Sequence, residues 1–177
     1  MPVQVDLLAN LPLFDGLSTV ELEELGSHLE SAEVDAKQTI IKEGDQPDHP
    51  IYILISGNVE VIKYGIDRRD HVISTLAAPS VFGEIEVLAR RPAIATVCTV
   101  SKCRLALLNR GVFEELCNNN RSCILKVVKN LATTLAYRLA ATDGRLAAYF
   151  SLTQNNDPEA IGQVHKTLYS SWHTAVD

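Results

Sequence analysis

The segment from Glu33 to Asn109 constrains the fold of this chain more than any other part of its sequence. Short runs rich in Val, Ile, Thr and Tyr alternate there with Gly, Pro, Asn and Asp. Such runs are typical of strands that are joined by tight turns. We predict strands over 32–35, 39–42, 51–55, 58–64, 70–76, 94–99 and 103–108. Many short strands at this spacing favour an antiparallel barrel or sandwich.

One connection between two predicted strands is very short. It consists of Ser56, Gly57 and Asn58, directly after the apolar run that begins at Ile51. Glycine tolerates positive φ, which tight two- and three-residue connections require. We therefore interpret this tripeptide as a hairpin connection.

Helices are predicted on both sides of the strand-rich segment. Ser18 and Glu21 fit the Ser-x-x-Glu pattern of a capping box, which predicts a helix over about 19–30. Asn109 is a suitable N-cap for a short helix after the last strand. From 122 to 150 the chain has the pattern of one long helix.

The long predicted helix carries a narrow apolar stripe. Apolar residues recur along it at three- and four-residue steps, close to a heptad seam. A helix of this length on a small barrel needs a partner surface, so we predict a homodimer. The predicted contacts are Leu125, Val128, Leu131, Leu135 and Leu139. The alternative is a helix that folds back on its own barrel, and both arrangements can hold in part.

These elements divide the chain into three parts. Residues 1–121 form the predicted barrel with its N-terminal helix, and residues 122–150 form the predicted dimerisation helix. Residues 151–177 form a tail, in which Pro158 and its acidic neighbours resemble the start of a short helix. The tail is too short for a helix-turn-helix domain, so we expect no direct DNA binding by this chain. The alternative is that the chain is a fragment of a longer protein that carries an output domain elsewhere.

Composition favours a protein of the cytoplasm. The formal net charge is −6 and the basic residues are dispersed, so no nucleic-acid footprint is evident. No apolar run approaches the roughly 18 residues that span a bilayer, and we expect no membrane segment. The N-terminus has no positive charge ahead of its apolar residues, unlike a signal peptide. We interpret the four cysteines as reduced thiols.

Four blocks of the sequence follow one another in an order and at a spacing shared with a known family. They are LFDGLSTVELEEL, KQTIIKEGDQPDHPIYILISGNVEVI, VFGEIEVLARRPAIATV and CRLALLNRGVFEEL, within residues 12–149. Together they resemble the cyclic-nucleotide-binding domains of catabolite activator protein and of protein kinase A regulatory subunits. The resemblance implies a mostly β fold, a double-stranded β-helix or jelly-roll-like barrel, with an N-terminal helix and a long C-terminal helix.

The third block contains the phosphate-binding cassette of that family. There, Phe-Gly-Glu opens a short helix whose backbone N–H groups face the cyclic phosphate. The resemblance implies that Glu84 accepts from the ribose 2′-hydroxyl. In the family an arginine directly after the cassette's proline pairs with the phosphate, and small residues follow it. The candidate ligand-binding residues are Phe82, Gly83, Glu84, Ile85, Glu86, Arg90, Arg91, Ala93, Ile94, Ala95 and Thr96.

This sequence departs from the family's pattern at three neighbouring places. Ala93 stands where the family has its arginine, Ile94 where a small residue is usual, and Glu86 where alanine is frequent. A missing charge-assisted bond and an added carboxylate both disfavour a bound phosphate. A loss of roughly 3–5 kcal/mol would weaken affinity several-hundred-fold or more. We therefore predict weakened or lost binding of cyclic AMP and cyclic GMP.

Arg90 and Arg91 support an alternative hypothesis. Both lie just before Pro92, and either side chain is long enough to reach over a loop. The chain would then be a functional cyclic AMP or cyclic GMP receptor in which one of them replaces the missing arginine. The competing interpretation is that both are solvated surface charges. Pro92 fixes its own φ and restrains Arg91, which limits how the loop could re-aim these side chains.

The sequence contains no enzyme motif that we would assign. It lacks Gly-x-Ser-x-Gly, His-Glu-x-x-His and a P-loop, and its cysteines include no Cys-x-x-Cys pair. We predict no catalytic residues and no metal site. The predicted function is a non-enzymatic regulatory or sensor module, with a cyclic nucleotide as the candidate ligand and a protein partner as another candidate input.

Overall fold

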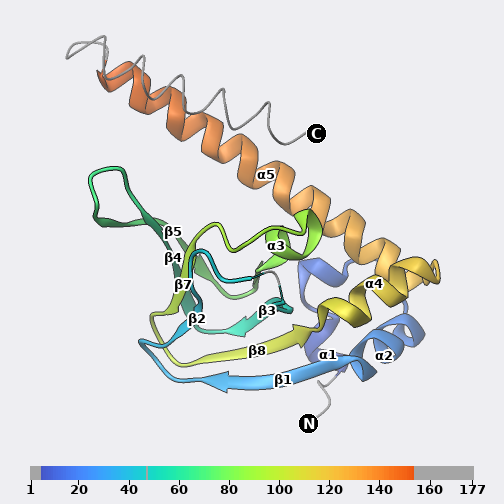
Figure 1. The fold of residues 1–177 in the computed structure, drawn as a ribbon. Helices are drawn as coiled ribbons and strands as arrows, with labels where there is room; N and C mark the ends of the chain where they lie inside the picture. The colour runs from blue at the N-terminus through green and yellow to red at the C-terminus, as the bar shows by residue number, and fades with distance from the viewer. Residues whose placement is uncertain (1–4, 47, 154–177) are drawn as a thin grey trace. The chain divides into compact units, whose positions relative to one another are not determined.

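Two antiparallel sheets form the body of the first part of the chain (Figure 1). The computed structural model describes residues 5–46 and 48–153. Its strands are β1 (Leu29–Val34), β2 (Thr39–Ile41), β3 (Ile51–Ser56), β4 (Asn58–Tyr64), β5 (Asp70–Ala77), β6 (Ser80–Phe82), β7 (Thr96–Thr99) and β8 (Cys103–Leu108). The strand order is β1-β8-β3-β6 in one sheet and β2-β7-β4-β5 in the other.

Helices flank the sheets, as the sequence predicted. They are α1 (Val5–Leu8), the 3₁₀ helix η1 (Pro12–Phe14), α2 (Thr19–Ser27), α3 (Glu84–Ala89), α4 (Arg110–Asn118) and α5 (Ser122–Thr153). In Figure 1, α1, α2 and α4 lie close together at one end of the sheets. The predicted fold class, a mostly β jelly-roll-like barrel with flanking helices, is confirmed.

The chain divides into two compact units at Ala132. The first unit, residues 1–132, contains both sheets and the first turns of α5. The described part of the second unit is the remainder of α5, from Thr133 to Thr153. The predicted tail helix lies outside the described residues, and the predicted domain boundary at residue 122 stays a prediction.

Alternation along the strands builds two hydrophobic cores. Ile51 and Ile53 of β3 pack in a core shared with the helices. Tyr52 and Leu54 of the same strand pack in a second core inside the barrel. Since successive side chains of a strand point to opposite faces, β3 is buried on both sides. This explains why its sequence is a continuous apolar run rather than an alternating one.

The interpretation of Ser56-Gly57-Asn58 as a hairpin was wrong. β3 pairs with β6 and β8, whereas β4 pairs with β5 and β7, so the tripeptide is a corner between the two sheets. Gly57 has a φ of 95°, and a Cβ there would lie 2.5 Å from the carbonyl oxygen of Lys102. The corner therefore requires glycine for the same local reason that a hairpin would.

The predicted elements differ from the observed ones in several further places, and β1 begins at Leu29 rather than at residue 32. The helix predicted over 19–30 ends at Ser27, because the chain enters β1 at Leu29. The strand β6, which has only three residues and pairs with β3, was not predicted, and neither were the short helices α1 and η1. Asn109 caps α4 as predicted, since its side chain accepts from the Gly111 N–H at 2.8 Å.

Glu21 joins α2 to the start of α5. It completes the predicted capping box, in which its own N–H donates to Ser18 Oγ at 3.4 Å. Its carboxylate also accepts from Lys126 Nζ at 2.7 Å and from Ser122 Oγ at 2.6 Å. These contacts, with that of Lys126 the largest, lower the pKa of Glu21 from its ordinary value to about 2.

The first part of the predicted apolar stripe of α5 is buried against the barrel of the same chain. Leu131 is fully buried in the helix-side core together with Cys123, Ile124 and Val127. Val128 also packs against that core. These positions of the predicted dimer seam are therefore occupied within the chain, because the first turns of the helix cover their own barrel.

Replacing Leu131 with alanine should lower the free energy of unfolding by about 2–5 kcal/mol, because it leaves a cavity in a closed core. The exposed Val20 on α2 gives the control, and Val20→Ala should cost about 1 kcal/mol or less. Urea unfolding followed by circular dichroism measures both values. Equal losses in the two variants would contradict the packing described for Leu131.

The lowered pKa of Glu21 predicts a loss of stability in acid. A carboxyl with a depressed pKa stabilises the folded state above its unfolded pKa, and this contribution falls as the pH drops from about 4.5 to about 2. Glu21→Gln should flatten that part of the curve of unfolding free energy against pH. Glu23→Gln, an exposed carboxylate on the same helix, is the control and should leave the slope as in the wild type.

Candidate functional site

The turn that begins α3 is held by the barrel core. Phe82 stacks on Tyr52, with ring centroids 5.0 Å apart and planes inclined by 7°. Gly83 follows as the N-cap with a φ of 75°, and a Cβ there would lie 3.0 Å from Tyr52 Cδ2 and 3.1 Å from the Pro50 carbonyl oxygen. Only glycine satisfies both the left-handed backbone and this close approach without strain. Burial also raises the pKa of Tyr52.

Two carboxylates are buried in the first turn of α3. Glu84 is 2% exposed and Glu86 is 5% exposed, whereas Ile85 between them is partly exposed. The Glu86 Oε1 atom accepts a hydrogen bond from the Ile94 N–H at 3.1 Å. Buried carboxylates are uncommon and are normally satisfied by partners. For Glu86 the partner is the backbone of the loop that follows α3.

That loop is fixed to residues 43–45 of the chain. Ala93 donates its N–H to the Asp45 carbonyl at 2.8 Å, and its own carbonyl accepts from the Gly44 N–H at 2.8 Å. The Ala93 side chain is buried in the barrel core, and Ala95 is also buried. Farther along, Thr96 Oγ1 accepts from the Glu43 N–H at 3.0 Å.

Lys63 holds the same loop from β4. Its ammonium donates to the Ile94 carbonyl at 2.6 Å and also binds the Glu43 carboxylate. Glu43 in turn accepts from the Tyr64 N–H at 3.0 Å, and the Lys63 contact is the largest cause of its lowered pKa. Both backbone polar groups of Ile94 therefore have partners, the N–H in Glu86 and the carbonyl in Lys63.

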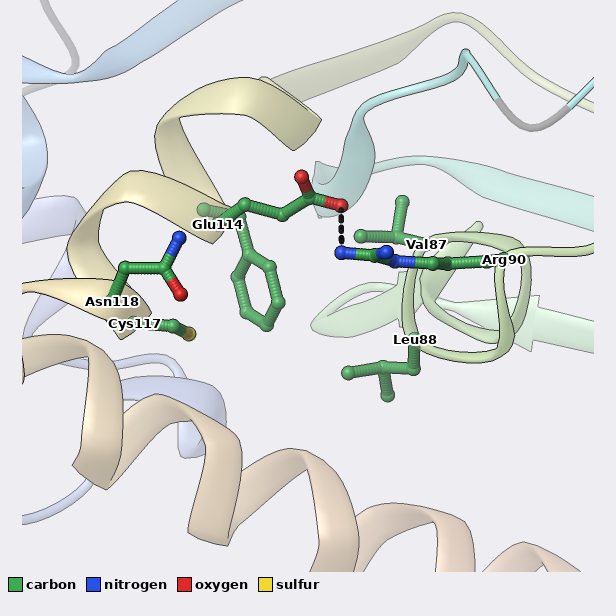
Figure 2. Close-up of a pocket in the computed structure, with 7 residues that line it drawn as sticks. Val87, Leu88, Arg90, Glu114, Cys117 and Asn118 are labelled. Atoms are coloured by element: carbon green, nitrogen blue, oxygen red, sulfur yellow. Dashed lines mark ion pairs between the residues drawn. The ribbon is translucent and has the colours of Figure 1, made fainter.

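Arg90 points to α4 rather than to this loop (Figure 2). It ends α3 in the left-handed conformation with a φ of 51°, and its guanidinium lies 3.3 Å from the Glu114 carboxylate. Arg110 donates to the same carboxylate at 3.0 Å, and the two arginines lower the pKa of Glu114, with Arg110 the larger cause. Arg91 is exposed.

A cavity of about 210 Å³ separates α3 from α4 where Arg90 meets Glu114 (Figure 2). It is lined by Val87, Leu88, Arg90, Phe113, Glu114, Cys117 and Asn118. Its walls combine apolar side chains of the two helices with the charged pair at its edge. Burial raises the pKa of Cys117.

The structure brings together most of the predicted cassette. Glu84, Glu86, Ala93 and Ile94 lie on one short helix and the loop that bonds back to it, whereas Arg90 is engaged elsewhere. Sequence reasoning missed Lys63 and the loop around Asp45. Lys63 lies 31 positions before Ile94, so no local motif signals their contact.

The described residues hold neither a metal cluster nor a membrane-spanning helix. Among residues 5–46 and 48–153, no three His, Cys, Asp or Glu side chains gather as a metal site would require. In the same part of the chain, no helix has the length and apolar character of a membrane span.

Residues 32–120 match the model of the cyclic nucleotide-binding domain. A similar protein is the potassium channel AKT1 of Oryza sativa subsp. indica, which is 34% identical over 114 residues. The match covers 64% of this chain and 12% of the channel, so the chain spans about an eighth of that relative.

Two solved structures come from regulatory subunits of cAMP-independent protein kinase A. The Trypanosoma cruzi protein, bound to guanosine, has a TM-score of 0.64 and 26% identity, over 92% of this chain and 49% of that one. A Trypanosoma brucei mutant, bound to cAMP in the A site, has a TM-score of 0.64 and 27% identity, over 73% of this chain and 45% of that one.

The substitutions in the Trypanosoma brucei mutant have a spacing that this chain shares. A glutamate is replaced by alanine, a threonine seven positions later by arginine, and the next residue, a valine, by alanine. Glu86, Ala93 and Ile94 have the same spacing, and the new residues are those that the binding pattern favours. Family model, fold and cassette agree, and the chain belongs to the cyclic nucleotide-binding domain family.

Proposed function

We propose that this chain is a non-enzymatic regulatory module that rejects cyclic monophosphates and takes an uncharged nucleoside at its cassette. The observation that carries the proposal is the hydrogen bond from the Ile94 N–H to the buried Glu86 carboxylate. A carboxylate of the chain thereby occupies a backbone donor at the site where the family places an anionic phosphate. The chain therefore supplies the negative charge at this site, and the ligand does not have to carry a negative charge.

Electrostatics argue against a second anion at this place. Glu86 is 5% exposed, so water screens its charge poorly. Ala93 offers no cation, and Lys63 is already bound to Glu43 and to the Ile94 carbonyl. A phosphate would meet like charge without a counter-ion, at a cost of roughly 3–5 kcal/mol. An uncharged ligand avoids that cost.

The trypanosomal structures support a nucleoside as the uncharged ligand. One of these regulatory subunits is bound to guanosine, and both are described as cAMP-independent. The variant of the other that binds cAMP carries the arginine and alanines that this chain lacks at matching spacing. A nucleoside keeps the ribose hydroxyls and the base of a cyclic nucleotide but has no phosphate.

The competing function is a cyclic AMP or cyclic GMP receptor that uses Arg90 or Arg91. Arg90 is 70% exposed and its pair with Glu114 is a surface contact, so breaking that pair would cost about 1 kcal/mol or less. The Glu86 carboxylate would remain beside the phosphate in either case. This leaves the receptor hypothesis as the weaker proposal.

We also propose that the chain forms a homodimer through α5 and is located in the cytoplasm. Leu125 and Leu139 on the predicted stripe of α5 are about half exposed, and Leu135 lies between them in that stripe. We assign these side chains to contacts with a second copy of the chain, and a protein partner to the output. The four cysteines are free thiols, which a reducing cytoplasm favours.

Isothermal titration tests the proposed ligand class. The wild type should bind guanosine and show no heat with cyclic AMP or cyclic GMP at micromolar concentrations. The triple variant Glu86→Ala, Ala93→Arg, Ile94→Ala should gain cyclic nucleotide binding by at least several hundred-fold, since it removes the like charge and adds the counter-ion. Micromolar binding of cyclic AMP by the wild type, lost in Arg90→Ala or Arg91→Ala, would instead establish the receptor hypothesis.

The single variant Ala93→Arg is the matched control for Glu86. With Glu86 retained, the new guanidinium should pair with this carboxylate, so the gain in cyclic nucleotide affinity should stay well below that of the triple variant. An equal gain in both variants would show that Glu86 does not oppose the phosphate.

Light scattering tests the dimer. The wild type should have twice the 19.4 kDa mass of one chain, and Leu135→Asp should reduce it to a monomer because it places a charge in the apolar seam. Ala140→Asp, on the other side of the same exposed helix, is the control and should remain a dimer. A monomeric wild type, or a dimer unaffected by Leu135→Asp, would contradict the assigned interface.

A further inference from the structure

We propose that Glu86 is the specificity-determining residue of the site, and that its second carboxylate oxygen accepts a hydrogen bond from a ligand hydroxyl. The hydroxyl is one that phosphorylation would esterify, so the module distinguishes a nucleoside from its phosphorylated forms. This inference rests on the proposed function and deepens it, because it names the chemical group that selects the ligand.

The hydrogen bonding of Glu86 is incomplete. Among the described residues, the Ile94 N–H at 3.1 Å is the hydrogen bond that the structure gives to this carboxylate. An ionised carboxylate offers about four acceptor positions on its two oxygens. At 5% exposure such a group normally has its hydrogen-bonding capacity filled by protein groups or by ordered water, and a ligand hydroxyl can take the place of that water.

The first oxygen of Glu86 and the loop are fixed before any ligand arrives. Ile94 donates its N–H to Glu86, and its carbonyl accepts from Lys63. Ala93 is bonded to Gly44 and Asp45 through both of its backbone groups. The carboxylate therefore cannot swing freely to a new partner, and the ligand must bring a donor to the second oxygen.

A hydroxyl and a phosphate ester meet this oxygen with opposite results. A hydroxyl donates to a carboxylate in a charge-assisted bond, with O···O distances of about 2.5–2.7 Å. A phosphate ester at the same place has acceptor oxygens and a charge of roughly −1.5 to −2 at pH 7. The same residue therefore attracts the free hydroxyl and repels its ester.

Glu84 and Glu86 can then each bind a different hydroxyl of the ligand. The family's pattern assigns Glu84 to the ribose 2′-hydroxyl, and Glu84 is 2% exposed in the same turn of α3. Glu86, two positions later, faces the loop instead. We assign to Glu86 the 3′- or 5′-hydroxyl, the two positions that a cyclic phosphate bridges. The occupancy of a module with this arrangement responds to the concentration of a nucleoside relative to that of its phosphate esters.

Calorimetry with a series of guanosine derivatives tests the assignment. Compared with guanosine, guanosine 5′-monophosphate should bind the wild type at least about a hundredfold more weakly, and either 3′-deoxyguanosine or 5′-deoxyguanosine about tenfold more weakly. Glu86→Gln keeps an acceptor oxygen but loses the charge. It should bind guanosine within about tenfold of the wild type and lose most of its discrimination against the monophosphate.

Glu84→Gln is the matched control, because it changes the neighbouring buried carboxylate by the same atoms. It should lose the response to removal of the 2′-hydroxyl but keep the rejection of the monophosphate. Thermal unfolding monitored by circular dichroism establishes that each variant is folded. If a variant does not fold, binding of the guanosine derivatives to the wild type still tests the assignment, because it needs no substitution.

Two results would overturn the inference, and only one of them would also reject the proposed function. Equal binding of guanosine, 3′-deoxyguanosine and 5′-deoxyguanosine by the wild type would exclude a hydroxyl contact at Glu86, while nucleoside binding as the proposed function would stand. An absence of binding by every nucleoside in the series would reject both the inference and the proposed ligand class.

Discussion

One hydrogen bond, from the Ile94 N–H to the Glu86 carboxylate, determines what the site can bind. It closes the cassette by joining the first turn of α3 to the loop that follows the helix. In a domain that waits for a phosphate, a ligand would make that connection. Here a buried side chain of the protein makes it, and Lys63 secures the other face of the same residue. Under our proposal the carboxylate of Glu86 takes the place of a ligand anion, and the ligand has the role of a neutral hydrogen-bond donor.

The remainder of the first unit supports this arrangement. Two cores meet at β3, so Tyr52 can hold the start of α3 while Ile51 and Ile53 pack against the helices. At its far end α3 contacts α4 through Arg90 and Glu114, and α4 leads directly into α5. The first turns of α5 are part of the same core through Leu131 and the Glu21 contacts. The cassette is thus connected by short steps to the helix that we assign to a partner.

Local patterns predicted most of the fold. The β-branched runs marked seven of the strands, and the Ser18–Glu21 capping box and the Asn109 N-cap marked the starts of α2 and α4, because these signals act within a few residues. The corner at Gly57 was mistaken for a hairpin because both need the same positive φ, and only pairing of distant strands separates them. In the site, Glu86 was predicted to repel a phosphate, but its bond to Ile94 was not predicted. That bond depends on a loop whose position is set by Asp45 and Lys63, which are remote in sequence.

A crystal structure of the wild-type chain with guanosine bound tests the central claim most directly. The account predicts a ribose hydroxyl within about 2.5–2.7 Å of the second oxygen of Glu86, with the first oxygen still on the Ile94 N–H. A crystal grown with cyclic AMP should show no cyclic nucleotide at this place. A cyclic phosphate seated there, with Glu86 displaced and Arg90 or Arg91 on its oxygens, would contradict the account.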